Sequence, residues 1–419
     1  MLRRSLRIAW LGPVPGGVAS ATGVNAELLH GLAERGHRIV CFFPSAGHPL
    51  PPDLLADGNL QFVWGTNRWQ WDKWYSRTKF TAFASGLFAR GFASVRLRQA
   101  IVRSHAREPY DLIFQTSSIE SLAVPRSVAR TIPLVIRPDT HIAGELRWLI
   151  AERRLSFRAQ PRYVFLLVAA IMAVRVLVQR ISIGRARLLV CISAVFRDHL
   201  VRDYSFPAAS TIVVPNPVKL DRFSLSRPSS RDGTATVLVL GRVSTRKGIE
   251  DVVAVAKSLL ERQRDIRIRV VGGPSLWSDY TRLLDDLPDA NAEYAGSISS
   301  AQVPEELANA DILLQASRYE PFALTVAEAL AAGVPVVATS EVGAIEGVDR
   351  SVVAEVRPGD VEGFVVAIET LLARSRADPV NLSARARAEA QRLFAPEKVC
   401  EQLSDALERL VDEAECDGT

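Results

Sequence analysis

The stretch from Glu320 to Glu328 carries residue types suited to holding an anion and a diol. Pro321 fits the first turn of a helix, where its missing N–H costs nothing. Glu320 would lie at the mouth of the anion site. Glu328, eight residues on, falls on a similar helical face and could accept hydrogen bonds from a ribose diol. An ordinary surface helix with two glutamates is the alternative. In the first interpretation, free N–H groups point toward the anion from the next residues, which are Phe322, Ala323, Leu324 and Thr325.

A basic loop, Gly241-Arg242-Val243-Ser244-Thr245-Arg246-Lys247-Gly248, directly follows the apolar stretch Thr236 to Leu240. Two cations on a glycine-bounded loop at the end of a strand suit a pyrophosphate. Arg242 can bind two oxygens, while Lys247 supplies a point charge. The spacing is not that of a P-loop. A solvated basic turn is the alternative.

A third candidate for phosphate binding is Pro15-Gly16-Gly17, where glycines would let backbone N–H groups approach closely. The dinucleotide-binding pattern Gly-x-Gly-x-x-Gly is not matched. No acidic residue ends the second expected strand, Val40-Cys41-Phe42-Phe43. Both facts argue against a nicotinamide-dependent enzyme.

These motifs lie between apolar stretches that alternate between strand and helix patterns. Residues 6–11 read as a strand, 25–35 as a helix ended by Gly36, and 37–43 as the next strand. This alternation predicts α/β architecture with parallel sheets. Residues 225–234 hold no bulky apolar cluster and read as a linker. Further strands are expected at residues 111–115, 133–137, 188–192, 236–240, 266–271, 311–315 and 335–338.

The chain is long enough for two domains, at 419 residues. We expect an N-terminal domain over 1–224, a C-terminal domain over 225–394, and a final segment over 395–419. The final segment would form a helix that packs back toward the N-terminal domain, with Val399, Leu403, Leu407 and Leu410 on one stripe.

Charge is divided unevenly between the two halves. Residues 1–224 hold 30 Lys and Arg against 14 Asp and Glu, whereas residues 225–419 hold 21 against 32. The basic half therefore suits an anionic partner, such as an acidic membrane surface or a phosphorylated substrate. Nucleic acid is disfavoured because no recognition motif accompanies the charge.

Four widely spaced cysteines exclude a disulfide framework and suit a reducing cytosol. No targeting signal is expected, and the longest uncharged apolar run, Tyr163 to Val174, is too short to span a bilayer.

The run from Arg158 to Ile183 reads as one amphipathic helix with an arginine-rich polar half. Such a helix could lie in a membrane interface with its arginines toward anionic headgroups. A buried helix of the N-terminal domain is the alternative. Residues 64–75 hold four tryptophans and read either as local packing or as a platform for a sugar or lipid acceptor.

The three phosphate-binding signals, arranged in this way across two Rossmann-like halves, resemble those of family 4 of the retaining nucleotide-sugar glycosyltransferases. This family has the GT-B fold, with two Rossmann-like parallel-sheet domains facing a central cleft. The resemblance extends over nearly the whole chain. Its other matching segments are Arg35-Gly36-His37, Cys191-Ile192-Ser193, Val214-Pro215-Asn216-Pro217-Val218, Val271-Gly272-Gly273-Pro274 and Ala310-Asp311-Ile312.

The resemblance implies a role for each motif residue. Gly16 and Gly17 would contact the donor phosphate, and Arg242 and Lys247 would neutralise the leaving pyrophosphate. Glu320 would hold hydroxyls of the donor sugar. Glu328 would bind the ribose, and the loops at Gly273-Pro274 and Ser297-Ile298 would border the base. The family needs no metal and no cofactor.

The chain departs from the family where a histidine usually stands close to the reacting sugar. Asp139 occupies that position in Arg137-Pro138-Asp139-Thr140-His141, and His141 is the competing candidate. Gly343-Ala344-Ile345-Glu346 also replaces a common Gly-Gly-x-Pro-Glu pattern. The departures leave donor binding intact and affect the acceptor side.

The expected protein is therefore a cytosolic, retaining, metal-independent glycosyltransferase. It would move a hexose-type unit from a nucleotide diphosphate sugar to an acceptor hydroxyl, either lipid-linked or part of a cell-surface glycan. A transferase acting on a soluble metabolite or protein, and a catalytically silent nucleotide-sugar binder, are the alternatives.

Overall fold

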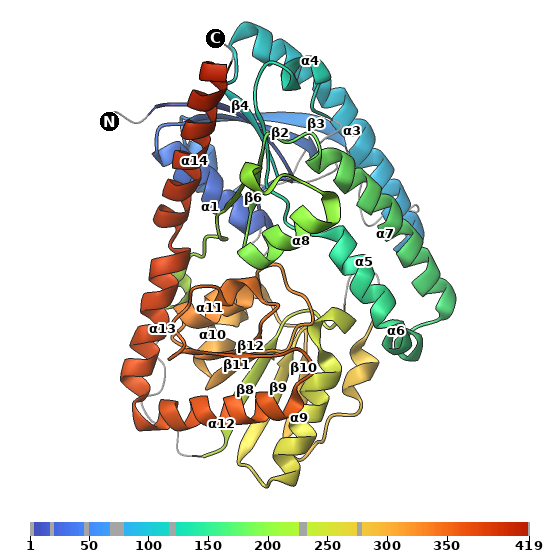
Figure 1. Ribbon diagram of the computed structural model, residues 1–419, viewed down its shortest axis with the longest axis vertical. Helices are drawn as coiled ribbons and strands as arrows, with labels where there is room; N and C mark the ends of the chain where they lie inside the picture. Colours follow the sequence, from blue (N-terminus) through green and yellow to red (C-terminus); the bar gives the residue numbers. More distant parts are fainter. Residues whose placement is uncertain are drawn as a thin grey trace.

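The computed structural model describes residues 4–16, 21–45, 50–67, 79–116, 123–225, 233–274 and 279–417. Two sheets whose strand pairs are all parallel lie one beyond the other along the long axis (Figure 1). The first sheet and its helices form the first lobe, up to residue 225. The second sheet and its helices form the second lobe, from residue 233 to the end of α13 (Pro379–Phe394). The predicted α/β class with two parallel sheets is confirmed.

Each sheet is doubly wound, because its strand order reverses near the middle. The first sheet has seven strands, in the order β3 (Leu60–Asn67), β2 (Arg38–Ser45), β1 (Arg7–Leu11), β4 (Leu112–Gln115), β5 (Leu134–Ile136), β6 (Leu188–Cys191) and β7 (Thr211–Val213). The second has six, in the order β10 (Ala292–Gly296), β9 (Ile266–Val271), β8 (Ala235–Leu240), β11 (Ile312–Gln315), β12 (Val336–Thr339) and β13 (Val353–Val356). In such sheets ligands bind beyond the carboxyl ends of the strands at the reversal point.

Helices cover both faces of each sheet. Those of the first lobe are α1 (Ala21–Glu34), α2 (Pro52–Ala56), α3 (Lys79–Arg107), α4 (Arg126–Ala129), α5 (Ile142–Ala151), α6 (Arg153–Ala159), α7 (Arg162–Ile183) and α8 (Ala194–Tyr204). Those of the second are α9 (Ile249–Glu261), α10 (Val303–Ala308), α11 (Leu324–Ala331), α12 (Val361–Ala377) and α13.

The strands that the sequence missed are β3, β7, β10 and β13, and these are the four edges of the two sheets. Central strands are buried on both faces and read as continuous apolar runs. The edge strand β10, Ala-Glu-Tyr-Ala-Gly, leaves Tyr294 and Ala295 exposed and has no such run. Apolar patterning therefore detects the centre of each sheet and misses its borders.

The last helix, α14 (Pro396–Asp417), returns to the first lobe and packs against α1 (Figure 1). Its predicted apolar stripe is confirmed, since Val399, Leu403, Leu407 and Leu410 are all buried in one cluster with the first sheet. The chain thus passes between the lobes twice, once after β7 and once at Ala395. At these crossings Val218 N–H donates to the Phe394 carbonyl at 2.9 Å.

The single helix predicted over Arg158 to Ile183 is wrong. Pro161 interrupts it, so that Arg158 belongs to α6 and α7 begins at Arg162. A proline is favoured at a helix start and disrupts a helix interior, which explains the break. In the described part of the chain, α7 alone is long and apolar enough to cross a bilayer, judged by length and composition. Helices of this length and composition also occur within folded domains, and α7 packs on α5.

Candidate functional site

The basic loop and the glutamate motif meet at the reversal point of the second sheet. The loop Gly241 to Gly248 follows β8, and the segment ending in Glu320 follows the neighbouring strand β11. Because both strands are parallel, their carboxyl ends open to the same edge. The fold therefore brings together two motifs that lie more than seventy residues apart in the sequence.

Glu320 is the centre of a buried ion cluster. Its Oε2 atom accepts a hydrogen bond of 2.8 Å from Arg246 Nη1 and also contacts Lys247 Nζ. Burial alone would raise the pKa of Glu320, but the charges of Lys247 and Arg246 outweigh burial and hold that pKa at about 2. The cluster joins the loop after β8 to the segment after β11.

Arg246 is a site residue that the sequence analysis missed. Its guanidinium also donates to the Tyr319 carbonyl at 3.1 Å, so it fixes the backbone on both sides of Glu320. Its position beside Lys247 in the basic loop was the available signal. Three basic residues and one carboxylate lie together here, because Arg242 and Lys247 line the same small hollow. Basic side chains outnumber the carboxylate by two, which suits a diphosphate.

Arg242, unlike Lys247, has an exposed side chain. Both line a small hollow with Gly241 and Gln315 at the ends of β8 and β11. Gly248 closes the loop with a φ of +66°, and a Cβ there would lie 2.0 Å from the Ala316 carbonyl oxygen. Only glycine allows the loop to approach the Ala316 carbonyl this closely, and the loop therefore packs directly against the end of β11.

The helix after the glutamate motif begins later than the sequence predicted. α11 starts at Leu324, so Pro321 lies before the helix and not in its first turn. Ala323 precedes the helix with a φ of +73°, an uncommon conformation for a residue with a side chain. Leu324 and Thr325 form the first turn, whose N–H groups lack partners within the helix. Phe322 is buried and packs edge-on against Phe394 at 5.5 Å.

The two loops expected to border a base lie side by side. A Cβ on Gly273 would lie 2.4 Å from Ser297 Oγ, and Ile298 packs against the main apolar core. The Gly273 carbonyl accepts a hydrogen bond of 2.8 Å from Val243 N–H, and Pro274 forms a β-bridge with Val243. The basic loop therefore rests directly on the Gly273-Pro274 loop.

Glu328 lines a cavity of about 230 Å³ between the lobes. Burial raises the pKa of its carboxyl to about 7, although the charge of Arg222 opposes this. Leu324, one turn earlier on α11, lines the same cavity, and α1 closes it with Val24 and Glu27. The cavity thus continues from the start of α11 toward the first lobe.

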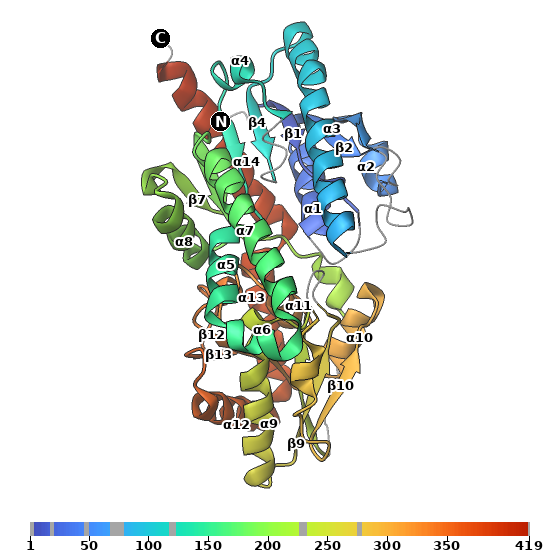
Figure 2. The same cartoon turned by 90° about the vertical axis from the view of Figure 1, so that its right-hand side faces the viewer.

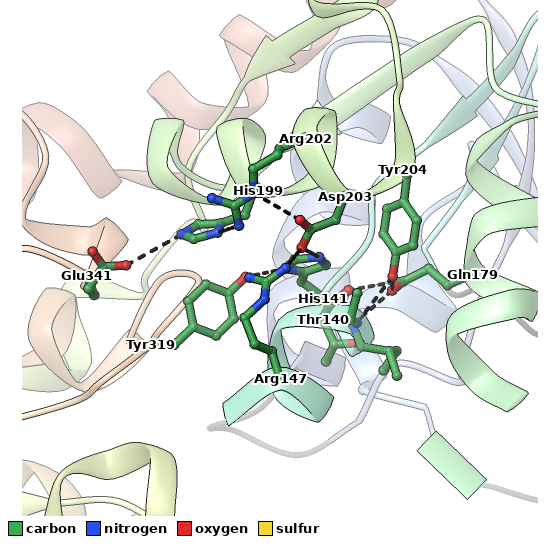
Figure 3. A network of polar contacts seen from close by, with 12 residues as sticks. Thr140, His141, Arg147, Gln179, His199, Arg202, Asp203, Tyr204, Tyr319 and Glu341 are labelled. Carbon is green, nitrogen blue, oxygen red and sulfur yellow. Dashed lines mark hydrogen bonds and ion pairs between the residues drawn. The ribbon is translucent and has the colours of Figure 1, made fainter. Parts of the chain in front are cut away.

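Asp139 and His141 occupy different environments. The Asp139 side chain is partly exposed and lies 3.3 Å from Nη1 of the fully buried Arg137. His141 is buried, with Nδ1 2.8 Å from Tyr319 Oη and Nε2 3.1 Å from Asp203 Oδ2 (Figure 3). Burial lowers the pKa of His141 to about 4, so it is neutral at pH 7.

The His141 contacts belong to a network that joins the lobes (Figure 3). Tyr319 comes from the second lobe, while Asp203 and His199 come from α8 of the first. His199 Nε2 lies 3.5 Å from Glu341 Oε2 across the same junction. Because Tyr319 directly precedes Glu320, this network places the loop of Asp139 on the Glu320 side of the cleft.

Glu346 provides a second connection between the lobes. Its two carboxylate oxygens accept hydrogen bonds from Ala194 N–H at 2.6 Å and Val195 N–H at 2.7 Å, at the start of α8. A carboxylate at this position also interacts favourably with the helix dipole. Ser193 Oγ donates to the Pro321 carbonyl at 2.7 Å. Glu346, the last residue of the segment that departs from the family pattern, therefore caps a helix of the other lobe.

Some sequence expectations fall outside the described residues. These include Gly17, the tryptophans at 69, 71 and 74, and most of the predicted linker. Gly16 is described and lies just beyond β1. Within the described ranges, His, Cys, Asp and Glu side chains form no group of three or more that could hold a metal ion.

Comparison with known proteins agrees with this geometry. The model of Glycosyl transferases group 1 matches residues 222–392, and that of Glycosyltransferase Family 4 matches residues 21–222. A glycogen synthase from Mycobacterium tuberculosis is 29% identical over 214 residues, covering 49% of this chain and 49% of the relative. The matched region thus spans about half the length of that curated relative.

Two solved structures share the fold over almost the whole chain. Sucrose-phosphate synthase from Thermosynechococcus elongatus superposes with a TM-score of 0.70 at 20% identity, covering 98% of this chain and all of that one. HepE from Anabaena, in complex with UDP and glucose, superposes with a TM-score of 0.61 at 17% identity, covering 96% and 100%. The fold is GT-B, and the chain belongs to the group 1 glycosyltransferases of family 4.

Glu328 predicts a pH dependence of stability. Its pKa is about 7 in the folded state and near 4.5 in the unfolded state, so the folded protein favours the protonated form. Stability from this group is complete below about pH 4.5 and is lost as the pH rises through about 7. At pH 8, Glu328→Gln should be more stable than the unchanged protein by about 3 kcal/mol, and at pH 4 equally stable. Urea unfolding of both proteins at the two pH values measures this. A difference that does not change with pH would contradict the assignment.

Proposed function

We propose that this protein transfers a hexose-type sugar from a nucleotide diphosphate sugar to an acceptor hydroxyl. The observation that carries the proposal is the ion cluster of Arg242, Arg246, Lys247 and Glu320, with its net positive charge at the reversal point of the second sheet. The diphosphate would lie against Arg242 and Lys247. The first turn of α11, at Leu324 and Thr325, would supply further N–H donors.

The nucleoside would extend from the diphosphate along α11. Glu328 would accept hydrogen bonds from the ribose hydroxyls within the interlobe cavity. The base would then lie toward the Gly273-Pro274 and Ser297-Ile298 loops. Gly16 and Gly17 would approach the phosphates from the first lobe, and Glu320 would hold hydroxyls of the donor sugar.

The transfer would retain the anomeric configuration and need no metal ion. As the bond between the anomeric carbon and the phosphate oxygen breaks, the leaving diphosphate gains negative charge, which Arg242 and Lys247 stabilise. The acceptor oxygen forms the new bond on the same face, and its proton passes to the leaving phosphate oxygen. Protein cations and helix N–H groups thus supply the charge stabilisation that a divalent ion supplies in other transferases.

The acceptor is proposed to be lipid-linked or part of a cell-surface glycan, so that the protein acts at the cytoplasmic face of a membrane. The basic character of residues 1–224 and the apolar exposed surface of α7 support this choice over a soluble metabolite or protein. A catalytically silent binder is the remaining alternative. Donor hydrolysis by the purified protein, measured across a panel of nucleotide sugars, distinguishes it from an enzyme.

Lys247→Ala should lower the transfer rate about 10²–10³-fold, because the leaving diphosphate loses a buried cation. Glu320 keeps Arg246 as a partner in this variant, so the protein should remain folded. Lys257→Ala, on the exposed side of α9 in the same lobe, is the matched control and should transfer at the normal rate. Initial rates with a saturating donor measure the effect. If Lys247→Ala kept near-normal turnover, the diphosphate would have to bind elsewhere.

Transfer should persist in excess chelator, because protein cations carry out the charge stabilisation. The measurement is the initial rate after dialysis against EDTA, with and without added Mg²⁺ or Mn²⁺. A loss of activity on chelation that either ion restores would refute the metal-independent mechanism.

Asp139 and His141 should differ in the kind of defect that their loss causes. We place Asp139 in contact with the reacting sugar, so Asp139→Asn should lower kcat with little change in nucleotide affinity. His141 is buried against Tyr319 and Asp203, so His141→Ala should mainly lower stability, by about 1–3 kcal/mol. Steady-state kinetics and thermal melting separate the two effects. A larger kcat loss for His141→Ala would assign the sugar contact to the histidine.

A further inference from the structure

Helix α7 turns a row of apolar side chains away from the protein. Tyr163, Leu166 and Ile181 are between 65% and 72% exposed, whereas the buried side of the helix combines the polar Gln179 and Ser182 with Phe165 and Ile183. Ala170, Val174 and Leu177 continue the exposed row, which recurs every three or four residues along one face. The side of α7 turned away from the protein is therefore apolar over nearly its whole length.

The polar residues on the buried side of α7 are hydrogen-bonded to the first lobe. Gln179 Oε1 accepts hydrogen bonds from Ile142 N–H at 2.9 Å and Tyr204 Oη at 2.6 Å, while its Nε2 donates to the Thr140 carbonyl at 2.6 Å (Figure 3). Ser182 Oγ accepts a hydrogen bond of 3.0 Å from Gln115. A helix that crossed the bilayer would lose these bonds without replacement, so α7 stays on the lobe and presents its apolar side outward.

Helix α3 carries a second exposed apolar row. Phe88, Phe92, Val95 and Val102 are exposed and fall on one helical face. Both helices lie on the side that faces the viewer in Figure 2. Burial lowers the pKa of Arg175 on α7; the charge of Glu145 on α5 opposes this shift, and that of Arg90 on α3 adds to it. Together the two exposed rows form what we call the α3–α7 face.

Positive charge surrounds this face. The sequence contains no Asp or Glu from Lys79 to Arg107, nor from Arg153 to Arg197, and both stretches are rich in arginine. Burial lowers the pKa of Arg185, and the nearby charges of Arg126 and Arg98 lower it further. Like charges gathered beside an exposed apolar surface are stabilised by an anionic partner.

We propose that the α3–α7 face docks the protein on the surface of an anionic lipid bilayer. The apolar rows would enter the boundary between headgroups and acyl chains, and the arginines would bind lipid phosphates. A second copy of the chain fits less well, since a two-fold contact would set basic surface against basic surface. The inference rests on the proposed function in one respect: that function gives the reason for docking, which is to bring the protein to a membrane-bound acceptor.

Docking would also orient the cleft. The helix beneath α7 is α5, which begins just after His141 and the loop of Asp139. The bonds from Gln179 hold that loop at Thr140 and Ile142. The surface that meets the lipid is thus one helix layer from the loop assigned to the acceptor side.

The test is co-sedimentation with vesicles of phosphatidylcholine alone or with 30% phosphatidylglycerol. We expect the unchanged protein to bind the anionic vesicles, and binding to weaken as salt is added. The triple variant Leu166→Gln, Leu177→Gln, Ile181→Gln should reduce binding at least tenfold. These side chains are exposed, so the fold should be unaffected. The matched control is Leu260→Gln, Val366→Gln, Val380→Gln, which changes three exposed apolar residues of the second lobe and should bind normally.

A charge variant tests the arginines separately. Arg162→Glu with Arg180→Glu should reduce binding to anionic vesicles at least tenfold, whereas Arg376→Glu on α12 should not. Donor hydrolysis without vesicles should be normal in all of these variants. No binding to anionic vesicles by the unchanged protein, with hydrolysis intact, would overturn the docking proposal and leave the proposed function standing. A dimer in solution that the triple glutamine variant dissociates would also overturn it, and would assign the face to a second copy.

Discussion

The loops at the carboxyl end of the second sheet depend on one buried carboxylate shared by two cations. Glu320 holds Arg246 and Lys247 in place after β8, and they hold Glu320 in place after β11. Loss of both cations would leave the buried carboxylate of Glu320 uncompensated, which costs about 3–5 kcal/mol. The cluster therefore fixes the geometry of the cleft before any ligand arrives. A diphosphate entering it would meet charges that need little rearrangement, and such preorganisation is the main source of electrostatic stabilisation in enzymes.

Holding Glu320 against its two cations also constrains the backbone nearby. Ala323 is held at positive φ where the chain turns from Glu320 into α11, and Gly248 approaches the Ala316 carbonyl more closely than any side chain would allow. Strain of this kind, about 1–3 kcal/mol, persists only where the surroundings over-determine it. Here the surroundings include the first lobe, because Ser193 bonds the Pro321 carbonyl and Glu346 caps α8. The loops around Glu320 and the junction between the lobes therefore hold each other in place.

The sequence predicted the centres of both sheets and singled out the two motifs that the fold brings together, because both signals are local. Apolar runs mark strands buried on two faces, and the motifs carry their chemistry within nine residues. The edge strands lack that signal. The roles of Arg246, Tyr319 and Glu346 depend on contacts between distant segments, which no local spacing encodes. For α7, the sequence predicted one arginine-rich polar side. In the structure Arg162 and Arg180 are exposed while Gln179 and Ser182 are buried, because a helical wheel does not say which side meets the protein.

The hydrogen bond between Val218 and Phe394 joins the two places where the chain passes from one lobe to the other. Two covalent crossings held side by side would act as one narrow hinge in any swing of the lobes. The polar contacts of Glu346 and His141 with the opposite lobe, and the apolar core that both lobes share, would have to separate for the cleft to open. Substrate entry would then require this junction to come apart, while the paired crossings would keep the two lobes aligned.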